Sequence, residues 1–371
     1  MSRRLRPLGA PLADRHVQLQ AHYELANPPT DAISSIKYAP DSFRLLVASW
    51  DKFVYLYDTS PSLNQLLNKF EHRAPVLEVC FGENDGIAYT AGLDWDVRRS
   101  IQALSIVKLL LNIHRINLAT QEQTVLSSHT AGVRSVVYCL KENILISASW
   151  DCTLHIHHLS DPSRQVTKIS LPNKPFSLSA SETKLVVAMA ARALHIYELS
   201  SLATSETPEE PWQRRESSLK FMTRAVSCMP TDLGYASSSI EGRVAVEWFD
   251  PSPESQARKY AFKCHRQPSP EGVDVVYPVN ALAFHPIHGT FASGGGDGFI
   301  ALWDGVAKRR IRQYQKYAHS VAALCFSPDG RLLAAAVCPG FEDGREGIGE
   351  GEVKIYIKEL GENEAKGKGA K

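Results

Sequence analysis

Short alternating stretches of apolar and polar residues recur along the chain, each followed by an all-apolar stretch and then by another alternating one. The clearest copy has an alternating segment at 32–38, an apolar segment at 45–49 and a third segment at 54–58. Alternation with period two indicates strands with two different faces, and a run of small apolar residues indicates a strand buried on both sides. Polar residues separate these segments at hairpin distances. Each copy therefore predicts a small antiparallel sheet.

The same unit recurs with a spacing of about 40 to 45 residues, the period of WD-repeat propellers. Trp50-Asp51, Trp150-Asp151 and Trp303-Asp304 carry the Trp-Asp pair that is typical of those repeats. The chain thus resembles the WD-repeat family, which predicts an all-β, seven-bladed β-propeller forming a single domain. Clear copies of the unit begin at Ala32, Gly132, Val279 and Val321, and weaker copies begin at Val76, Phe176 and Thr223.

The ends of the propeller follow from the need to close the ring. A propeller leaves no open sheet edge when both termini supply strands to one blade. We expect Tyr23-Glu24-Leu25 to pair with the segment 353–357, which places the propeller at residues 22–360. Residues 1–21 and 361–371 are expected to be disordered tails, the first basic and the second rich in Lys, Gly and Glu.

The basic N-terminal segment has a second interpretation. Arg3, Arg4 and Arg6 are followed by no apolar core, so no secretory signal is expected. An Arg-rich start with few acids also fits a transit peptide, but a disordered tail is favoured.

One segment interrupts the second unit. The third strand there is expected to run from Asp94-Trp95-Asp96-Val97 directly into Ile116-Asn117-Leu118, but residues 100–115 intervene. This stretch is rich in Leu and Ile and contains no acid. It fits a binding insertion, a surface loop, or retained non-coding sequence in the gene. The last is favoured, because so apolar a loop would be a sticky surface patch.

Composition sets limits on the class of protein. Hydrophobic residues make up 44% of 371 residues, enough for a large core, and the formal net charge is +1. That balance gives no overall attraction to nucleic acid or a membrane. The longest apolar stretch, 101–113, is too short to span a bilayer. The seven cysteines form no CxxC pair, which predicts small buried side chains in a reducing compartment.

No catalytic motif occurs in the chain. There is no GxGxxG, P-loop, HExxH or GxSxG sequence, so we expect no enzyme, no cofactor and no metal site. The histidines at 155, 157 and 158 and the pair Cys264-His265 are interpreted as structural, since none has zinc spacing. A propeller hydrolase is the alternative, but it needs His and carboxylates around a channel whose strands look small and apolar.

The aspartates of the repeated turns are a separate set with a structural interpretation. We expect each of them to accept hydrogen bonds from backbone N–H groups of its own turn. They are Asp51, Asp94, Asp151 and Asp297.

What remains is a surface. In WD propellers the turn between the second and third strands lies on the same side, here called the top face, as the segment that enters the first strand. This face is expected to carry Trp50, Lys52, Trp150, Phe299, the stretch 214–224 and Arg243. Exposed Trp beside Arg is typical of binding hot spots. The alternative is that each Trp is buried against a neighbouring blade.

A closer resemblance extends along nearly all of residues 22–357. It is carried by the runs 214–220, 239–247, 250–254, 260–266 and 277–280. In these runs the chain is similar to the Bub group of WD-repeat spindle-checkpoint proteins. The related WD-repeat messenger-RNA export factors of the nuclear pore share residues 239–245 and 262–266. They usually have Ser-Pro-Leu-Lys in place of 217–220 and lack the run at 250–254, which favours the checkpoint group.

The resemblance implies a non-catalytic adaptor with two kinds of protein partner. One is the GLEBS motif, a short segment with paired glutamates in the checkpoint kinase and its kinase-like paralogue. The other is the phosphorylated Met-Glu-Leu-Thr repeat of the kinetochore scaffold. The expected location is the nucleus, the kinetochore in mitosis, and the cytoplasm. We expect a monomer that contacts neither nucleic acid nor membrane directly.

Specific residues are assigned to each partner. Trp50, Trp150, Lys52 and Phe299 are predicted to bind the GLEBS segment. Arg224 and Arg243, with Lys220 as a weaker third charge, are predicted to bind phosphothreonine, since Arg forks match phosphate oxygens. The alternative is that the two arginines are solvated or pair with Glu216 and Glu241.

Overall fold

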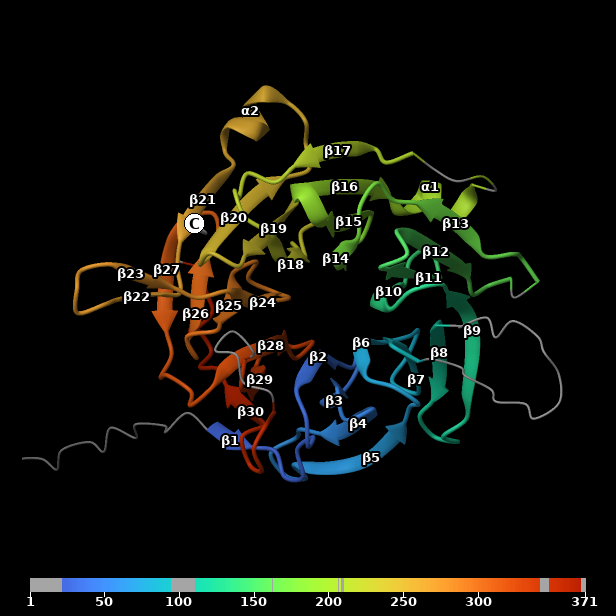
Figure 1. The fold of residues 1–371 in the computed structure, drawn as a ribbon, viewed down its shortest axis with the longest axis horizontal. Helices are drawn as coiled ribbons and strands as arrows, with labels where there is room; N and C mark the ends of the chain where they lie inside the picture. Colours follow the sequence, from blue (N-terminus) through green and yellow to red (C-terminus); the bar gives the residue numbers. More distant parts are fainter. Residues whose placement is uncertain are drawn as a thin grey trace, which may run out of the picture.

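A computed structural model describes residues 22–94, 111–161, 163–205, 207, 210–340 and 347–367. In this part of the chain, seven four-stranded antiparallel sheets are arranged around a central axis (Figure 1). The structure thus confirms the predicted all-β, seven-bladed propeller. None of its described helices is long and apolar enough to cross a membrane.

The blades are numbered along the chain, and each is given from its inner to its outer strand. Blade one contains β2 (Ile33–Tyr38), β3 (Arg44–Ser49), β4 (Phe53–Asp58) and β5 (Gln65–Glu71); blade two contains β6 (Val76–Phe81), β7 (Ile87–Gly92), β8 (Leu111–Asn117) and β9 (Gln123–His129). Blade three contains β10 (Val133–Cys139), β11 (Ile144–Ser149), β12 (Thr153–His158) and β13 (Thr167–Ser170); blade four contains β14 (Pro175–Ala180), β15 (Lys184–Met189), β16 (Ala193–Glu198) and β17 (Gln213–Glu216). Blade five contains β18 (Thr223–Cys228), β19 (Gly234–Ser239), β20 (Arg243–Trp248) and β21 (Tyr260–Lys263); blade six contains β24 (Val279–Phe284), β25 (Phe291–Gly295), β26 (Ile300–Asp304) and β27 (Arg309–Gln313). Blade seven contains β28 (Ser320–Phe326), β29 (Leu332–Cys338), β30 (Lys354–Glu359) and β1 (His22–Glu24).

Blade seven joins the two ends of the chain, as predicted. Strand β1 pairs with β30, with Tyr23 opposite Ile357 and Glu24 opposite Tyr356. The backbone N–H of Leu25 also donates to the carbonyl of Ile355. The ring is therefore closed by hydrogen bonds between segments more than 300 residues apart, which removes the open sheet edge.

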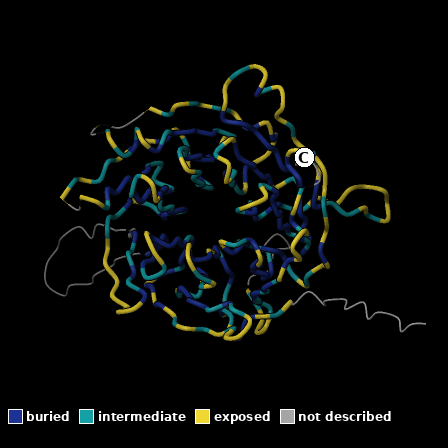
Figure 2. Tube along the Cα trace, turned by 180° about the vertical axis from the view of Figure 1, so that it is seen from behind, coloured by how far each residue is buried: buried dark blue, intermediate teal, exposed yellow. Residues whose placement is uncertain are grey.

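The inner strands pack against one another around the axis. Contacts join β2 to β6, β6 to β10, and so on around the ring until β28 returns to β2. The second strands are buried on both faces, since every residue of β7, β11, β19, β25 and β29 is buried. Figure 2 shows the consequence, with buried residues nearer the axis and exposed ones along the outer strands and loops.

A hairpin, short helices and a 3-10 turn lie outside the seven four-stranded sheets. A hairpin of β22 (Arg266–Pro268) and β23 (Asp274–Val276) projects outward between blades five and six (Figure 1). Among the described residues, the short helices α1 (Leu199–Thr204) and α2 (Pro253–Ala257) and the 3-10 turn η1 (Ala190–Arg192) lie in connections between strands.

The expected insertion in blade two is partly wrong. Strand β8 begins at Leu111, so residues 111–115 belong to the third strand and not to a loop. Ile113 lies opposite Ala91 and is fully buried. The physical reason is that Ile113 and Ile116 supply buried apolar side chains that this strand needs. The rest of the predicted insertion, residues 100–110, lies outside the described residues.

The C-terminal tail also differs from expectation. Residues 361–367, which we expected to be disordered, lie against blade six. Ala365 is only 3% exposed, and its carbonyl accepts a hydrogen bond of 2.7 Å from the Thr290 hydroxyl. Arg312 and Glu364 form an ion pair at 3.0 Å. One small apolar residue within a polar stretch is enough to dock it. The predicted tails at 1–21 and 368–371 lie outside the described residues.

Candidate protein-binding site at the mouth of the central channel

Each inner strand carries an irregularity near its start. The register skips the second residue in six of the inner strands and the third residue, Ala322, in β28, so that residue has no paired partner. Such a bulge turns the side chain away from the regular pleat. The residues at this position are Ser34, Leu77, Arg134, Phe176, Arg224, Asn280 and Ala322.

A second repeated position lies where the second strand ends. The residue that follows the second strand donates its backbone N–H to a carbonyl just before the inner strand. The N–H of Trp50 donates to the carbonyl of Ala32 and that of Trp150 to the carbonyl of Gly132, each at 2.9 Å. This bond holds the start of the turn over the inner strand. The side chains at this position are therefore placed beside the bulge residues.

The two positions together form a cavity of about 650 Å³, here called the axial cavity. Its lining comes from blades one, two, three, five, six and seven, so it lies on the propeller axis. Six of the seven bulge residues line it, all except Phe176. Arg134 and Arg224 are its charged residues, and no acid is among the described residues that line it. Arg134 also pairs with Glu78, which is not among the lining residues, at 3.7 Å. The axial cavity therefore combines apolar walls with two guanidinium groups, one of which has a carboxylate partner.

The two predicted tryptophans meet in this cavity. Trp50 is 41% exposed and Trp150 is partly buried, and both line the cavity. The indole of Trp150 lies over Gly132, where a side chain would come within 2.9 Å of the ring. The alternative of full burial against a neighbouring blade is wrong for Trp50. Trp150 is supported on one face and open on the other.

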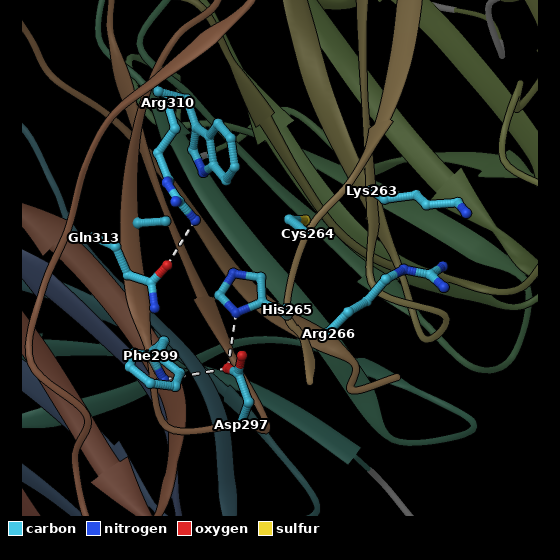
Figure 3. A pocket seen from close by; sticks show the side chains of 10 residues that line it. Lys263, Cys264, His265, Arg266, Asp297, Phe299, Arg310 and Gln313 are labelled. Carbon is cyan, nitrogen blue, oxygen red and sulfur yellow. Dashed lines mark hydrogen bonds and ion pairs between the residues drawn. The ribbon is translucent and has the colours of Figure 1, made fainter. Parts of the chain in front are cut away.

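Lys52 and Phe299 lie elsewhere. Lys52 occupies the left-handed position of its turn (φ 74°), which Gly242 and Gly298 occupy in blades five and six. Phe299 lines a separate pocket of about 220 Å³ between blades five and six. Figure 3 shows its ring beside Asp297, in a pocket that also carries Lys263, Arg266 and Arg310. The structure therefore does not bring Lys52 or Phe299 into the axial cavity.

The three predicted phosphate-binding residues are only partly brought together. Arg224 is exposed, lines the axial cavity, and donates to the Asn280 side chain at 3.0 Å. Arg243 begins the third strand, further from the axis, and pairs with Glu241 at 3.3 Å. Lys220 is exposed in the segment that enters β18. One of the alternative pairings thus holds for Arg243, whereas Glu216 pairs with Arg192 at 3.0 Å.

Two other arginines expected on the top face are not there. Arg214 and Arg215 lie in β17, the outer strand of blade four. The Arg215 guanidinium donates to the carbonyls of Trp248 (2.8 Å) and Phe249 (2.9 Å), so it holds blade four to blade five. The polar composition of this stretch is typical of a loop, so the sequence did not indicate that it forms the outer strand of the blade.

Three of the four turn aspartates, Asp51, Asp151 and Asp297, have the predicted structural role, whereas Asp94 accepts no backbone N–H among the described residues and contacts His114 instead. Asp51 accepts from the backbone N–H groups of Thr30 (2.9 Å) and Phe53 (3.1 Å). Asp297 accepts from Phe299 N–H and lies 2.8 Å from His265, which also contacts the Ser293 hydroxyl. These networks fasten the turn between the second and third strands to the preceding linker.

The histidines of blade three are also buried within the protein. His155 and His157 share the hydroxyl of Ser127, each at 3.1 Å. Burial lowers the pKa of His157 to about 4, which keeps the ring neutral at pH 7. No group of side chains that could hold a metal ion occurs among the described residues.

Sequence reasoning missed several residues of the site. Arg134 stands at the same bulge position as Arg224, and an alignment of the seven units at their second inner-strand residue reveals it. Phe221 (51% exposed) and Met222 (45% exposed) lie beside Lys220 in the entry segment, and Ile240 lines the axial cavity. These apolar residues extend the surface from the cavity over blade five.

Comparisons with known proteins agree with this architecture. The WD domain, G-beta repeat family matches residues 17–58, 120–158, 275–304 and 310–345. The chain is 44% identical to the mitotic checkpoint protein BUB3.1 of Arabidopsis thaliana, covering 93% of this chain and 94% of that protein. It is 34% identical to the spindle assembly checkpoint protein bub3 of Schizosaccharomyces pombe over 83% and 88% of the two chains. The mRNA export factor GLE2 of Chaetomium thermophilum is 29% identical over 89% and 87%.

Proposed function

The chain belongs to the Bub3 family of WD-repeat mitotic checkpoint proteins, and on this premise we propose that it is a non-catalytic adaptor of the spindle assembly checkpoint. The adaptor recruits checkpoint kinases to unattached kinetochores by binding two kinds of peptide. It acts in the nucleus and at kinetochores in mitosis, and it is also present in the cytoplasm.

The GLEBS segment of the kinases is assigned to the axial cavity. The observation that carries this proposal is that Trp50, Trp150, Arg134 and Arg224 meet in one cavity without an acidic side chain among the described lining residues. Two guanidinium groups between apolar walls suit a segment with paired glutamates, because charge-assisted hydrogen bonds are strong where water is excluded. Lys52 and Phe299, which lie outside the cavity, are assigned to the flanks of that segment.

The phosphorylated Met-Glu-Leu-Thr repeat is assigned to blade five. Arg224 and Lys220 supply exposed positive charge on the entry segment and at the start of β18. Phe221 and Met222 lie between them and offer apolar contacts for the Met and Leu of the repeat. Arg243 takes part once the phosphate competes with Glu241 for its guanidinium. Its contribution is therefore expected to be smaller than that of Arg224.

Trp150→Ala tests the GLEBS assignment. Truncation of a hot-spot Trp typically costs about 2 kcal/mol or more. We therefore expect the affinity for a GLEBS peptide of the checkpoint kinase, measured by calorimetry, to fall at least roughly tenfold for Trp150→Ala, and likewise for Trp50→Ala. Trp212→Ala is the matched control, because Trp212 has the same exposed fraction as Trp50, 41%, but lies outside the axial cavity. Unchanged affinity in both cavity variants would disprove the assignment.

Phosphate recognition is tested on the same instrument. We expect Arg224→Ala to abolish measurable binding of a phosphorylated Met-Glu-Leu-Thr peptide and Arg243→Ala to weaken it. Because Arg224 also lines the axial cavity and Arg243 does not, only Arg243→Ala is expected to leave the affinity for the GLEBS peptide nearly unchanged. Arg331→Ala serves as control, since Arg331 is 80% exposed beside Asp329 on another blade. Equal affinity of the parent protein for phosphorylated and unphosphorylated peptide would end this assignment.

The messenger-RNA export factor is the second candidate. It is favoured by the similarity to GLE2 and to the Schizosaccharomyces pombe poly(A)+ RNA export protein. A pull-down from mitotic lysate separates the two, because recovery of checkpoint kinases rather than a nuclear-pore component supports the checkpoint role.

A further inference from the structure

Three cavities on the top face are continuous with one another. The axial cavity shares Pro278, Ser320, Pro339 and Gly340 with a second cavity of about 250 Å³ between blades six and seven. That second cavity shares Lys316 and Ala318 with a third of about 510 Å³ further out. Cavities that share lining residues adjoin one another. A row of three adjoining cavities, here called the radial groove, therefore runs from the axis outward between blades six and seven.

The outer end of the radial groove is an aromatic pocket, here called the rim pocket. The rings of His22, Tyr317 and Tyr356 lie 4.8 to 5.8 Å apart by their centroids. The ring of Tyr314 forms a further wall, and the Lys358 ammonium lies 4.9 Å from its centroid. Such a pocket is built only because the ring closes here: His22 comes from β1, Tyr356 from β30 and Tyr317 from the linker after β27. It suits an apolar or ring-shaped side chain.

Basic side chains outnumber acidic ones along the radial groove. Arg134 and Arg224 line its inner end, and Lys316 and Lys358 line its outer end. Asp297 is the one acid among the described lining residues of the three cavities, and it already lies 2.8 Å from His265. The whole protein has a net charge of only +1, so this is a local concentration of positive charge. Charge complementarity therefore favours an acidic occupant.

We propose that the radial groove holds an extended acidic segment of the same partner that packs on Trp50 and Trp150, with one of its apolar side chains in the rim pocket. This inference rests on the proposed function and adds the direction in which the partner chain leaves the axis. A narrow groove that continues an apolar cavity suits an extended peptide, because a chain with alternating side chains can meet both the walls and the lysines. The rim pocket then adds affinity at a distance from the tryptophans.

Lys316→Glu tests the proposal with the GLEBS peptide of the checkpoint kinase as probe. Lys316 is exposed and stands where the second and third cavities meet. Reversal of its charge is expected to weaken binding roughly three- to tenfold and to reduce its dependence on salt. Lys259→Glu is the matched control, since Lys259 is also exposed but lies beyond α2 in blade five, and the change in net charge is the same. Its effect is expected to be less than about twofold.

A steric variant makes the test independent of charge. Ala318 is exposed at the same border, and Ala318→Trp should block the groove and weaken the same peptide. Shortening the peptide from the end that reaches the rim should remove the effect of both variants while leaving that of Trp150→Ala.

The outcomes separate the two levels of the argument. If Lys316→Glu and Ala318→Trp bind the full peptide like the parent protein while Trp150→Ala binds weakly, the groove proposal is wrong and the GLEBS assignment stands. If none of the three variants changes affinity, the GLEBS assignment itself fails. Tight, Lys316-dependent binding of a single-stranded RNA oligonucleotide in competition with the peptide would replace the acidic peptide by nucleic acid and so overturn the proposal.

Discussion

Blades two and three differ in the length of chain that connects the turn aspartate to the third strand. In blade three the third strand starts two residues after Asp151, and the turn is complete. Asp151 accepts from the backbone N–H groups of Thr130 (2.9 Å) and Thr153 (3.0 Å) and lies 3.1 Å from His129. In blade two the third strand starts at Leu111, and Asp94 meets His114 at 2.7 Å. The other Asp94 oxygen is buried and has no hydrogen-bond partner among the described residues.

The pairing register shows what the two blades share. Leu154 lies opposite Ala148 in blade three, and Ile113 lies opposite Ala91 in blade two. Both side chains are fully buried, although one follows its turn aspartate by three residues and the other by nineteen. The third strand is therefore the segment whose apolar side chain can fill the buried position opposite Ala148 or Ala91. The number of residues between this segment and the turn aspartate matters little, because loop closure entropy grows slowly with loop length.

The largest expected effect on stability comes from truncating the side chain that fills this buried position. Ile113→Ala and Leu154→Ala should each reduce the free energy of unfolding by about 2–5 kcal/mol, because each leaves a cavity in the core. Denaturant titration of both variants measures this. A loss below about 1 kcal/mol for Ile113→Ala alone would show that β8 is not the third strand of blade two.

The turn aspartates should differ between the blades. Asp151→Ala leaves two backbone N–H groups and His129 without their acceptor and should reduce stability by about 2–3 kcal/mol. Asp94→Ala removes its contact with His114 and should cost about half as much. Equal losses in the same titration would mean that the blade-two turn is as complete as that of blade three.

Acid should destabilise both blades through their buried histidines. Burial lowers the pKa of His72 in the linker of blades one and two, and of His157 in blade three, each to about 4. The unfolded chain takes up these protons near pH 6.5, so stability is complete above that pH and is lost as the pH falls toward 4. At pH 5.5 each histidine should cost about 1.4 kcal/mol. Melting curves at pH 7.5 and 5.5 check this, and His157→Asn should reduce the difference; an unchanged difference would contradict it.

The smallest effect is expected from deleting residues 100–115. In the shortened chain Val97 stands three residues before Ile116, which is the place that Ile113 takes now. Exchange of Ile for Val in a core typically costs about 0.5–1.5 kcal/mol, and shortening the long connection offsets it, since each halving of a loop's length regains roughly 0.6 kcal/mol. The melting temperature should therefore stay the same or rise. A large fall would show that the deleted residues are an essential part of the core.

Much of the fold could be predicted because the same pattern of strands and turns occurs seven times in the sequence. Three strands of most units follow from alternation within the unit, and the role of Asp51, Asp151 and Asp297 follows from turn chemistry. The closing strand β1 follows from the need to leave no open sheet edge. The sequence places residues 111–115 in an insertion, because the segment 94–97 looks like the direct continuation into Ile116. The structure uses Ile113 instead, because its side chain fills the buried position. Ala365 was missed because one small residue gives no periodic signal.

The candidate site was only half predictable for a related reason. Trp50 and Trp150 were found because they break the pattern of small residues in their turns, whereas Arg134 looks like any polar residue of a strand. That Arg134 and Arg224 reach the axial cavity depends on the bulge at the second residue of β10 and of β18, which is seen only when the strands are paired.

The sequence by itself determined the number of blades, the three inner strands of most of them and the residue types in the turns, because these depend on local alternation and turn chemistry. The tertiary structure alone decided which of those residues meet. Closure of the ring brought His22 to Tyr356 across the chain and joined three cavities into one groove, while Phe299 and Arg243 were placed away from the axis. The physical reason is that residues distant in sequence share a surface only after the blades pack around one axis, and no local pattern encodes that arrangement.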